Sequence, residues 1–193
     1  PSNDFSTLFR TMQGLQGDPS LAYQARLQGI YVHGCGTGFH RQLFPGGSLD
    51  LGFSATAMHY VSEIPCPITG HVHQVGARGA EAERFAEQAR ADWERILTAR
   101  ARELKPGGRL VVLNFGIDED GRYLGNTGGV HMFDTFERLW REMMEAGRIT
   151  RAEYDRATFA QVYRTMDEFK APLLEDGPVR RAGLRLVEAR SLY

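Results

Sequence analysis

The 193-residue sequence has few cysteines, no long apolar run and almost no net charge. Only Cys35 and Cys66 occur, so no disulfide framework and no CxxC motif is available, which suits a cytoplasmic protein. No apolar run approaches the ~20 residues of a membrane span. The formal charge of −1 gives no global field that would attract nucleic acid or an anionic membrane. We therefore expect a globular protein with neither nucleic acid nor a membrane as its partner.

An initiator methionine and a secretory leader are also missing. The chain opens on Pro1, a helix signal follows almost at once, and the chain stops at Tyr193 directly after a strand-like run. We expect both ends to be cuts through a larger protein.

The middle of the chain predicts a parallel βαβ unit. Segment 43–65 predicts a strand that starts near Leu49, and then a helix behind the N-cap residue Ser54. Segment 80–104 has the periodicity of a long amphipathic helix and ends in a Lys-Pro-Gly-Gly stop. Segment 109–116, RLVVLNFG, reads as a strand buried on both faces of a sheet. Together the helix, the stop and the second strand predict the second half of a βαβ crossover from the strand at Leu49.

The flanking segments predict shorter elements. An amphipathic helix should follow the capping residues Ser2 to Asp4, and segment 28–34 should form a short strand. Helices are predicted between residues 127 and 163, and a final strand over residues 184–193.

Four blocks of the chain carry a family pattern. PSNDFSTLF matches DLPxNDFNxLF, and GFHRQLFPGGSLDLGFSATAMHYVSEIP matches SFYGRLFPxxSLHxxxSSYSLHWLSQVP. ELKPGGRLVVL matches ELVPGGRMVL, and MMEAGRITRAEYD matches MVxEGxIxExKxD. In these blocks the chain resembles the plant-type SABATH carboxyl methyltransferases, with the same order and spacing over nearly its whole length.

The resemblance implies a fold, a reaction and a cofactor. SABATH enzymes use S-adenosylmethionine (SAM) to methylate small carboxylic acids, or ring nitrogens of xanthines. The implied fold is α/β, an incomplete Rossmann-like class I methyltransferase sheet with an inserted α-helical cap. The core would span residues 1–122, the cap 123–163, and the return helix and strand of the core 164–193. Many members of the family dimerise, so a homodimer is left open.

The resemblance also assigns residues to the substrate. His59 matches the pocket His of the family, and Tyr60 stands where a Trp is usual; in carboxylate-specific members that pair hydrogen-bonds the substrate carboxylate. Thr56 replaces a pocket Tyr, and Phe133 falls near a cap aromatic that covers the substrate ring. The replacements at Tyr60 and Thr56 bear more on which acid is the substrate than on the reaction class.

The cofactor side is sparser. Gly38 and Phe39 match a Ser-Phe pair of the family whose Phe flanks the SAM adenine. The glycine-rich DxGxxxG loop and the Asp that holds the adenosine part have no match in the sequence. The resemblance therefore implies the substrate half of a site and only the edge of the cofactor half.

Elementary chemistry fits a carboxylate acceptor. A carboxylic acid is ionised at pH 7, so it needs alignment rather than a general base. A neutral imidazole can donate one N–H, and a phenol can replace an indole as the second donor. On a helix, His59 and Tyr60 would face one side together with Thr56 and Glu63.

Competing interpretations are left open. His59 and Tyr60 can be a half-buried surface pair, and Phe39 a core aromatic. His71 and His73 form an HxH motif, but no cysteine or carboxylate at ligand spacing supports a metal. N-methylation of a heterocycle is the alternative within the family. A non-catalytic Rossmann-like fragment that binds a small molecule or a partner chain is the alternative outside it.

Overall fold

The computed structural model describes residues 4–126 and 128–192. It divides into two compact units, residues up to Thr37 and residues from Gly38 onward. None of the helices in the described part is long and apolar enough to cross a membrane.

The first unit is helical. It contains α1 (Phe5–Met12), a 3₁₀ turn η1 (Pro19–Leu21) and α2 (Tyr23–Arg26). The predicted α1 is confirmed, with Asp4 as the N-cap; the other two predicted capping residues lie outside the described residues. The strand predicted at 28–34 is wrong: the segment is irregular and Tyr31 is exposed. A short apolar run forms a strand only beside a partner, and no described strand pairs with it.

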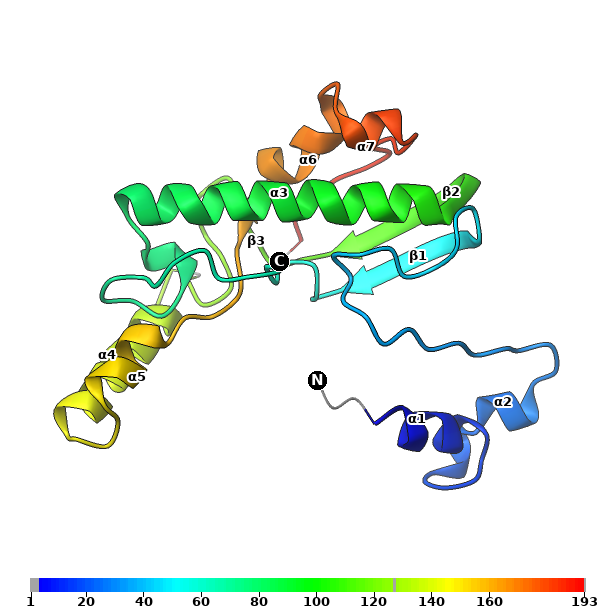
Figure 1. Cartoon of the computed structure of the whole chain (residues 1–193), viewed down its shortest axis with the longest axis horizontal. Helices are drawn as coiled ribbons and strands as arrows, with labels where there is room; N and C mark the ends of the chain where they lie inside the picture. Colours follow the sequence, from blue (N-terminus) through cyan, green and yellow to red (C-terminus); the bar gives the residue numbers. More distant parts are fainter. Residues whose placement is uncertain (1–3, 127, 193) are drawn as a thin grey trace. The chain divides into compact units, whose positions relative to one another are not determined.

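The second unit is built around one βαβ crossover. Strand β1 (Leu49–Ala55), helix α3 (Gly79–Glu103) and strand β2 (Leu104–Leu113) follow one another, and the two strands pair in parallel. Figure 1 shows α3 lying along the β1–β2 pair. The ladder slips once, where the Lys-Pro-Gly-Gly stop after α3 lies opposite the start of β1. A Cβ at Gly108 would lie 3.0 Å from the backbone oxygens of Leu49 and Lys105, so the slip favours glycine there.

The helix predicted after Ser54 is wrong. β1 continues to Ala55, and Thr56 has a left-handed backbone with φ of 51°. The next backbone N–H groups then find tertiary partners, because Val61 donates to Ala160 and Ser62 to the Asp92 carboxylate. A helix would need those donors for its own i−4 carbonyls.

The expectation that β2 is buried on both faces is also wrong. Leu110 and Val112 pack into the core, whereas Val111 is 45% and Leu113 42% exposed. Phe53 of β1 is 67% exposed. Within the unit from Gly38 onward, the cluster around Trp93 and Ile96 of α3 packs against Leu110 and Val112 and so covers one face of the pair.

The remaining elements include helices that pack on α3 and a pair of helices that pack on each other. They are η2 (Gln74–Gly76), β3 (Gly116–Ile117), α4 (Met132–Glu145), α5 (Arg151–Arg156), β4 (Arg164–Thr165), α6 (Met166–Leu174) and α7 (Pro178–Arg181). Capping boxes open α5 and α6, and β3 pairs in parallel with β4. Helices α6 and α7 contact α3, and α4 contacts α5 (Figure 1). The predicted final strand is wrong, since residues 184–192 pair with no described strand and Val187 is exposed; Tyr193 lies outside the described residues.

Candidate functional site

The candidate site lies where β1 and β2 end. Ala55 and Leu113, the last residues of the two strands, are direct partners in the ladder. The chain leaves β1 through Thr56 and makes a turn in which the Tyr60 N–H donates to the Ala57 carbonyl over 3.1 Å. In open α/β sheets the carboxyl ends of parallel strands are the usual place for ligands.

His59 is buried in an aromatic cluster at this edge. The imidazole is 1% exposed, and its ring centroid lies 4.8 Å from that of Tyr60, 5.1 Å from Phe115 and 6.2 Å from Tyr163. Burial lowers the pKa of His59, and the nearby Arg164 guanidinium lowers it further. His59 is therefore neutral at pH 7. Its buried Nδ1 has no hydrogen-bond partner among the described residues.

Tyr60 and Thr56 lie nearer the surface. Tyr60 is 43% exposed; its carbonyl lies 3.1 Å from His40 Nε2 and its backbone bridges to Gln161. Thr56 is exposed, and its N–H donates to Leu113. The turn thus brings His59 and Tyr60 together without a helix, while Thr56 ends the ladder.

The cap helix α4 reaches the same cluster through Phe133. This side chain is buried and stacks on His73, with ring centroids 3.9 Å apart and planes 13° apart. It also lies 6.0 Å from Tyr163, the ring that contacts His59. Tyr163 therefore connects two of the residues assigned from the sequence. Burial is the largest of the causes that raise the pKa of Tyr163 to about 12, so the phenol is neutral.

Arg164 is a buried charged residue that the sequence analysis does not predict. It is 2% exposed, and it donates from Nη1 to the Met58 carbonyl over 3.3 Å and from Nη2 to the Ala89 carbonyl over 2.7 Å. Its guanidinium carbon lies 5.6 Å from the ring centroid of Trp93. Arg164 thus fixes the backbone directly before His59. No pattern in the sequence around Arg164 indicates that it is buried or that it contacts the Met58 carbonyl.

Two carboxylates of α3 hold the chain on either side of the site. Asp92 is fully buried and accepts from both the N–H and the hydroxyl of Ser62, each over 2.8 Å. Glu103 is also fully buried; it pairs with Arg100 and accepts from the Leu43 N–H. The sequence predicts an amphipathic helix here but does not single out these two carboxylates, which are buried. Their only sequence signal is their place beside the apolar stripe.

A family model described as SAM dependent carboxyl methyltransferase matches residues 1–187. The chain belongs to this family. Indole-3-acetate O-methyltransferase 1 of Arabidopsis thaliana is 31% identical over 162 residues, which are 76% of this chain and 42% of that protein. Gibberellic acid methyltransferase 2 of the same organism is 28% identical over 184 residues, 89% of this chain and 46% of that protein.

A solved structure confirms the α/β methyltransferase fold. Loganic acid methyltransferase with SAH superposes with a TM-score of 0.66 and 19% identity, covering 81% of this chain and 47% of that one. The chain spans less than half the length of these relatives. The recognised family and fold are thereby confirmed, while the domain limits at residues 122 and 163 stay predictions.

Gly38 and Phe39 do not by themselves make a methyltransferase cofactor site. Gly38 is exposed, and a Cβ added to it would meet no atom within 4 Å. The half-buried Phe39 packs against the core cluster that contains Trp93 and Ile96, and its carbonyl accepts from Arg100 Nη1 over 2.9 Å. The described residues therefore do not fit SAM without further partners, and the cofactor role of this pair stays a prediction.

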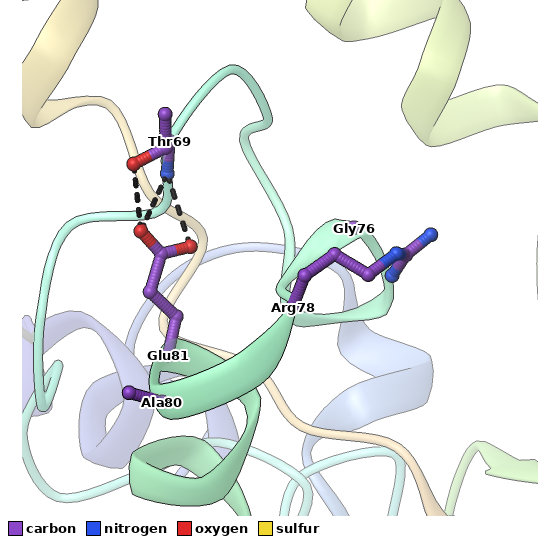
Figure 2. Close-up of a pocket in the computed structure, with 5 residues that line it drawn as sticks. All are labelled: Thr69, Gly76, Arg78, Ala80 and Glu81. Carbon is purple, nitrogen blue, oxygen red and sulfur yellow. Dashed lines mark hydrogen bonds between the residues drawn. The ribbon is translucent and has the colours of Figure 1, made fainter.

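A shallow hollow at the start of α3 lies outside this candidate site. It is lined by Thr69, Gly76, Arg78, Ala80 and Glu81. Figure 2 shows the Glu81 carboxylate turned onto Thr69, which donates its hydroxyl over 2.6 Å and also its N–H. Because these polar groups satisfy one another, the hollow anchors a loop rather than exposing a reactive group.

Proposed function

We propose that the protein is a SAM-dependent methyltransferase that transfers a methyl group to the carboxylate of a small acid, and that this chain supplies the substrate side of the site. The observation that carries the proposal is the buried, neutral His59 with an unpartnered Nδ1, set among aromatic rings at the carboxyl edge of the sheet. Family membership gives the reaction class.

The chain's own residues would bind and orient the acid. The acid is ionised at pH 7, so neither a base nor a proton transfer is required. His59 would hydrogen-bond one carboxylate oxygen, and the Tyr60 hydroxyl would be the second polar contact. Phe133 would line the wall on the cap side. Alignment of this kind contributes up to ~7–11 kcal/mol in favourable reactions.

The other assigned residues have supporting parts in the proposal. Thr56 would border the entrance, because it is exposed at the end of β1. Gly38 and Phe39 would meet the cofactor together with partners that the described residues do not include. SAM would supply the methyl group when bound.

The aromatic walls favour an acid with a flat or bulky apolar body. Rings of Phe115, Phe133, Phe159 and Tyr163 surround the buried imidazoles. The relatives named above carry indole-3-acetate and gibberellic acid in their names. We infer a substrate of that size class. A cytoplasmic location and a homodimer complete the proposal; the two free cysteines, Cys35 and Cys66, support the former.

The test begins with cofactor binding. Calorimetry would measure binding of SAM and of its demethylated product to the 193-residue chain and to the longest native form of the protein. Binding by the long form alone would support a cofactor site shared with segments outside this chain. Binding by neither would refute a methyltransferase and favour a non-catalytic module.

The second step is methyl transfer from labelled SAM to indole-3-acetate, gibberellic acid and benzoate. A base-labile methyl ester as product is expected, whereas an N-methylated heterocycle would show the alternative reaction. His59→Ala should lower kcat/KM about 10–100-fold, the effect of losing one hydrogen bond to a charged group. His131→Ala is the matched control, because that histidine is 49% exposed on the side chain. Unchanged turnover in His59→Ala would overturn the role of His59.

A further inference from the structure

His73 is a buried imidazole that the proposed function does not use. It lies on the loop before α3 and is 0% exposed. Besides its stack on Phe133, its ring lies 4.8 Å from Tyr163 and 6.3 Å from Phe159. It therefore belongs to the same aromatic cluster as His59, reached from the cap side.

The proton of His73 can be placed. Nδ1 accepts from the N–H of Val75 over 3.3 Å, so Nδ1 is unprotonated. Burial, with the nearby His71 and His59, lowers the pKa of His73 to about 3. The ring is neutral at pH 7, and its single proton must sit on Nε2. That N–H is buried without a partner among the described residues.

The loop that carries His73 is held in place. Glu81 binds Thr69 at one end of the loop (Figure 2), and Arg78 donates from Nη1 to the carbonyl groups of Val75 and Ala77 over 3.0 and 2.8 Å. A firmly held donor that lacks an acceptor is costly in a core but useful in a binding site.

A metal does not explain this imidazole. Among residues 4–126 and 128–192, no group of three His, Cys, Asp or Glu side chains could hold an ion. Nδ1 of His73 is occupied by Val75, and Nε2 of the neighbouring His71 lies 3.1 Å from Asp134 Oδ1. The His71 ring lies against the His73 backbone, with Nδ1 2.8 Å from the His73 carbonyl, so the two rings of the HxH motif have different partners.

We propose that His73 is a second substrate-binding residue, whose Nε2–H donates to the carboxylate of the acid that His59 also contacts. The two imidazoles approach the common neighbour Tyr163 from different segments, the loop before α3 and the turn after β1. The inference rests on the proposed function and adds a donor at a position that the family blocks in the sequence do not include.

Two neutral donors suit an anionic acceptor. A carboxylate has two oxygens and about four acceptor positions, so one oxygen can take hydrogen bonds while the other stays free to react. Neutral imidazoles bind it without forming a tight ion pair, and hydrogen bonds to an ionised acceptor are about twice as strong as neutral ones. The site should therefore prefer the acid over its ester.

The experiment uses the longest native form of the protein, with indole-3-acetate and its methyl ester as probes in the presence of demethylated SAM. His73→Phe keeps a flat ring beside Phe133 but removes the donor; His73→Gln keeps an N–H near the Nε2 position. We expect His73→Phe to weaken binding of the acid about 10-fold or more and to affect the ester less. His73→Gln should restore part of the loss, and the exposed-site control His131→Phe should change neither affinity.

Nitrogen NMR of the histidine rings gives a readout that does not depend on the variants. The His73 ring should be the neutral Nε2–H tautomer at pH 7, and its Nε2 resonance should move when the acid is added. An Nδ1–H tautomer, or equal acid affinity in His73→Phe and wild type, would overturn the inference. Failure of the wild type to bind demethylated SAM and the acid would instead refute the proposed function itself.

Discussion

The buried His73 should make the protein lose stability as the pH falls. In the unfolded chain this imidazole takes up a proton near pH 6.5, whereas in the folded protein burial lowers its pKa to about 3. Between these values the unfolded state binds more protons than the folded state. The free energy of unfolding therefore falls as the pH falls, and it is unaffected by His73 well above pH 6.5.

The size of the effect follows from the same two values. Each pH unit in this window changes the free energy of unfolding by about 1.4 kcal/mol for one proton. From about pH 7 to about pH 4.5, His73 alone should cost about 2.5 kcal/mol. His59 acts in the same direction, because burial also lowers its pKa. The two imidazoles are thus a substantial part of the expected acid sensitivity.

Urea denaturation followed by circular dichroism across this pH range would measure the effect. His73→Phe keeps the ring packing and removes the titration. The free energy of unfolding of the wild type should therefore fall relative to that of the variant as the pH falls. Contributions from other titrating groups cancel in this comparison. His131→Phe should track the wild type, because that side chain is 49% exposed. A variant whose pH dependence matched that of the wild type would refute a buried neutral imidazole at residue 73.

Two further predictions concern the supports of the site. Glu103→Ala leaves the Arg100 guanidinium buried without its carboxylate and should cost about 3–5 kcal/mol in urea denaturation, whereas the exposed Glu87→Ala on the same helix should change stability by less than about 0.5 kcal/mol. Gly76→Ala would place a Cβ in the volume of the His71 imidazole. This overpacking should lower the free energy of unfolding by about 1–3 kcal/mol, and the thermal midpoint should fall accordingly.

Each of these has a clear contrary result. If Glu103→Ala and Glu87→Ala were equally stable, the buried ion pair would not hold the segment that leads to β1. Gly46→Ala is the control for Gly76→Ala, because its Cβ would meet a backbone oxygen at an ordinary 3.5 Å. Equal midpoints for the two alanine variants would show that the loop yields without cost.

Periodicity and stop signals predict the βαβ crossover correctly, but they do not predict the turn that follows β1. The stripe on α3 and the glycines after it predict helix, stop and strand, because burial at a regular period is a local property of the sequence. The helix predicted after Ser54 failed because its donors go to Ala160 and Asp92, which are distant in the chain. No local pattern reveals partners that lie 30 residues away, as for Ser62 and Asp92, or farther, as for Val61 and Ala160.

The candidate site shows the same division. The resemblance identified His59, Tyr60 and Phe133, and the structure places these three rings in one aromatic cluster. The sequence does not predict the buried Arg164, and its HxH motif favours a solvated loop pair over a metal site, whereas His73 is buried. Their roles depend on which polar atoms become desolvated, and that is decided by tertiary packing.

The buried charges and the buried imidazoles have complementary tasks. Asp92 and Glu103 accept hydrogen bonds from backbone groups or a partner, and Arg164 donates from both Nη atoms while its buried Nε has no partner among the described residues; together they fix the segments that precede and follow the turn after β1. His59 and His73 are held by that frame, yet each keeps one ring nitrogen without a partner. Satisfied polar groups stabilise a core, whereas unsatisfied ones destabilise it unless a ligand supplies the missing hydrogen bond. Because the unpartnered nitrogens of both imidazoles belong to one aromatic cluster, the arrangement supports the proposal that this cluster binds an acceptor such as a carboxylate.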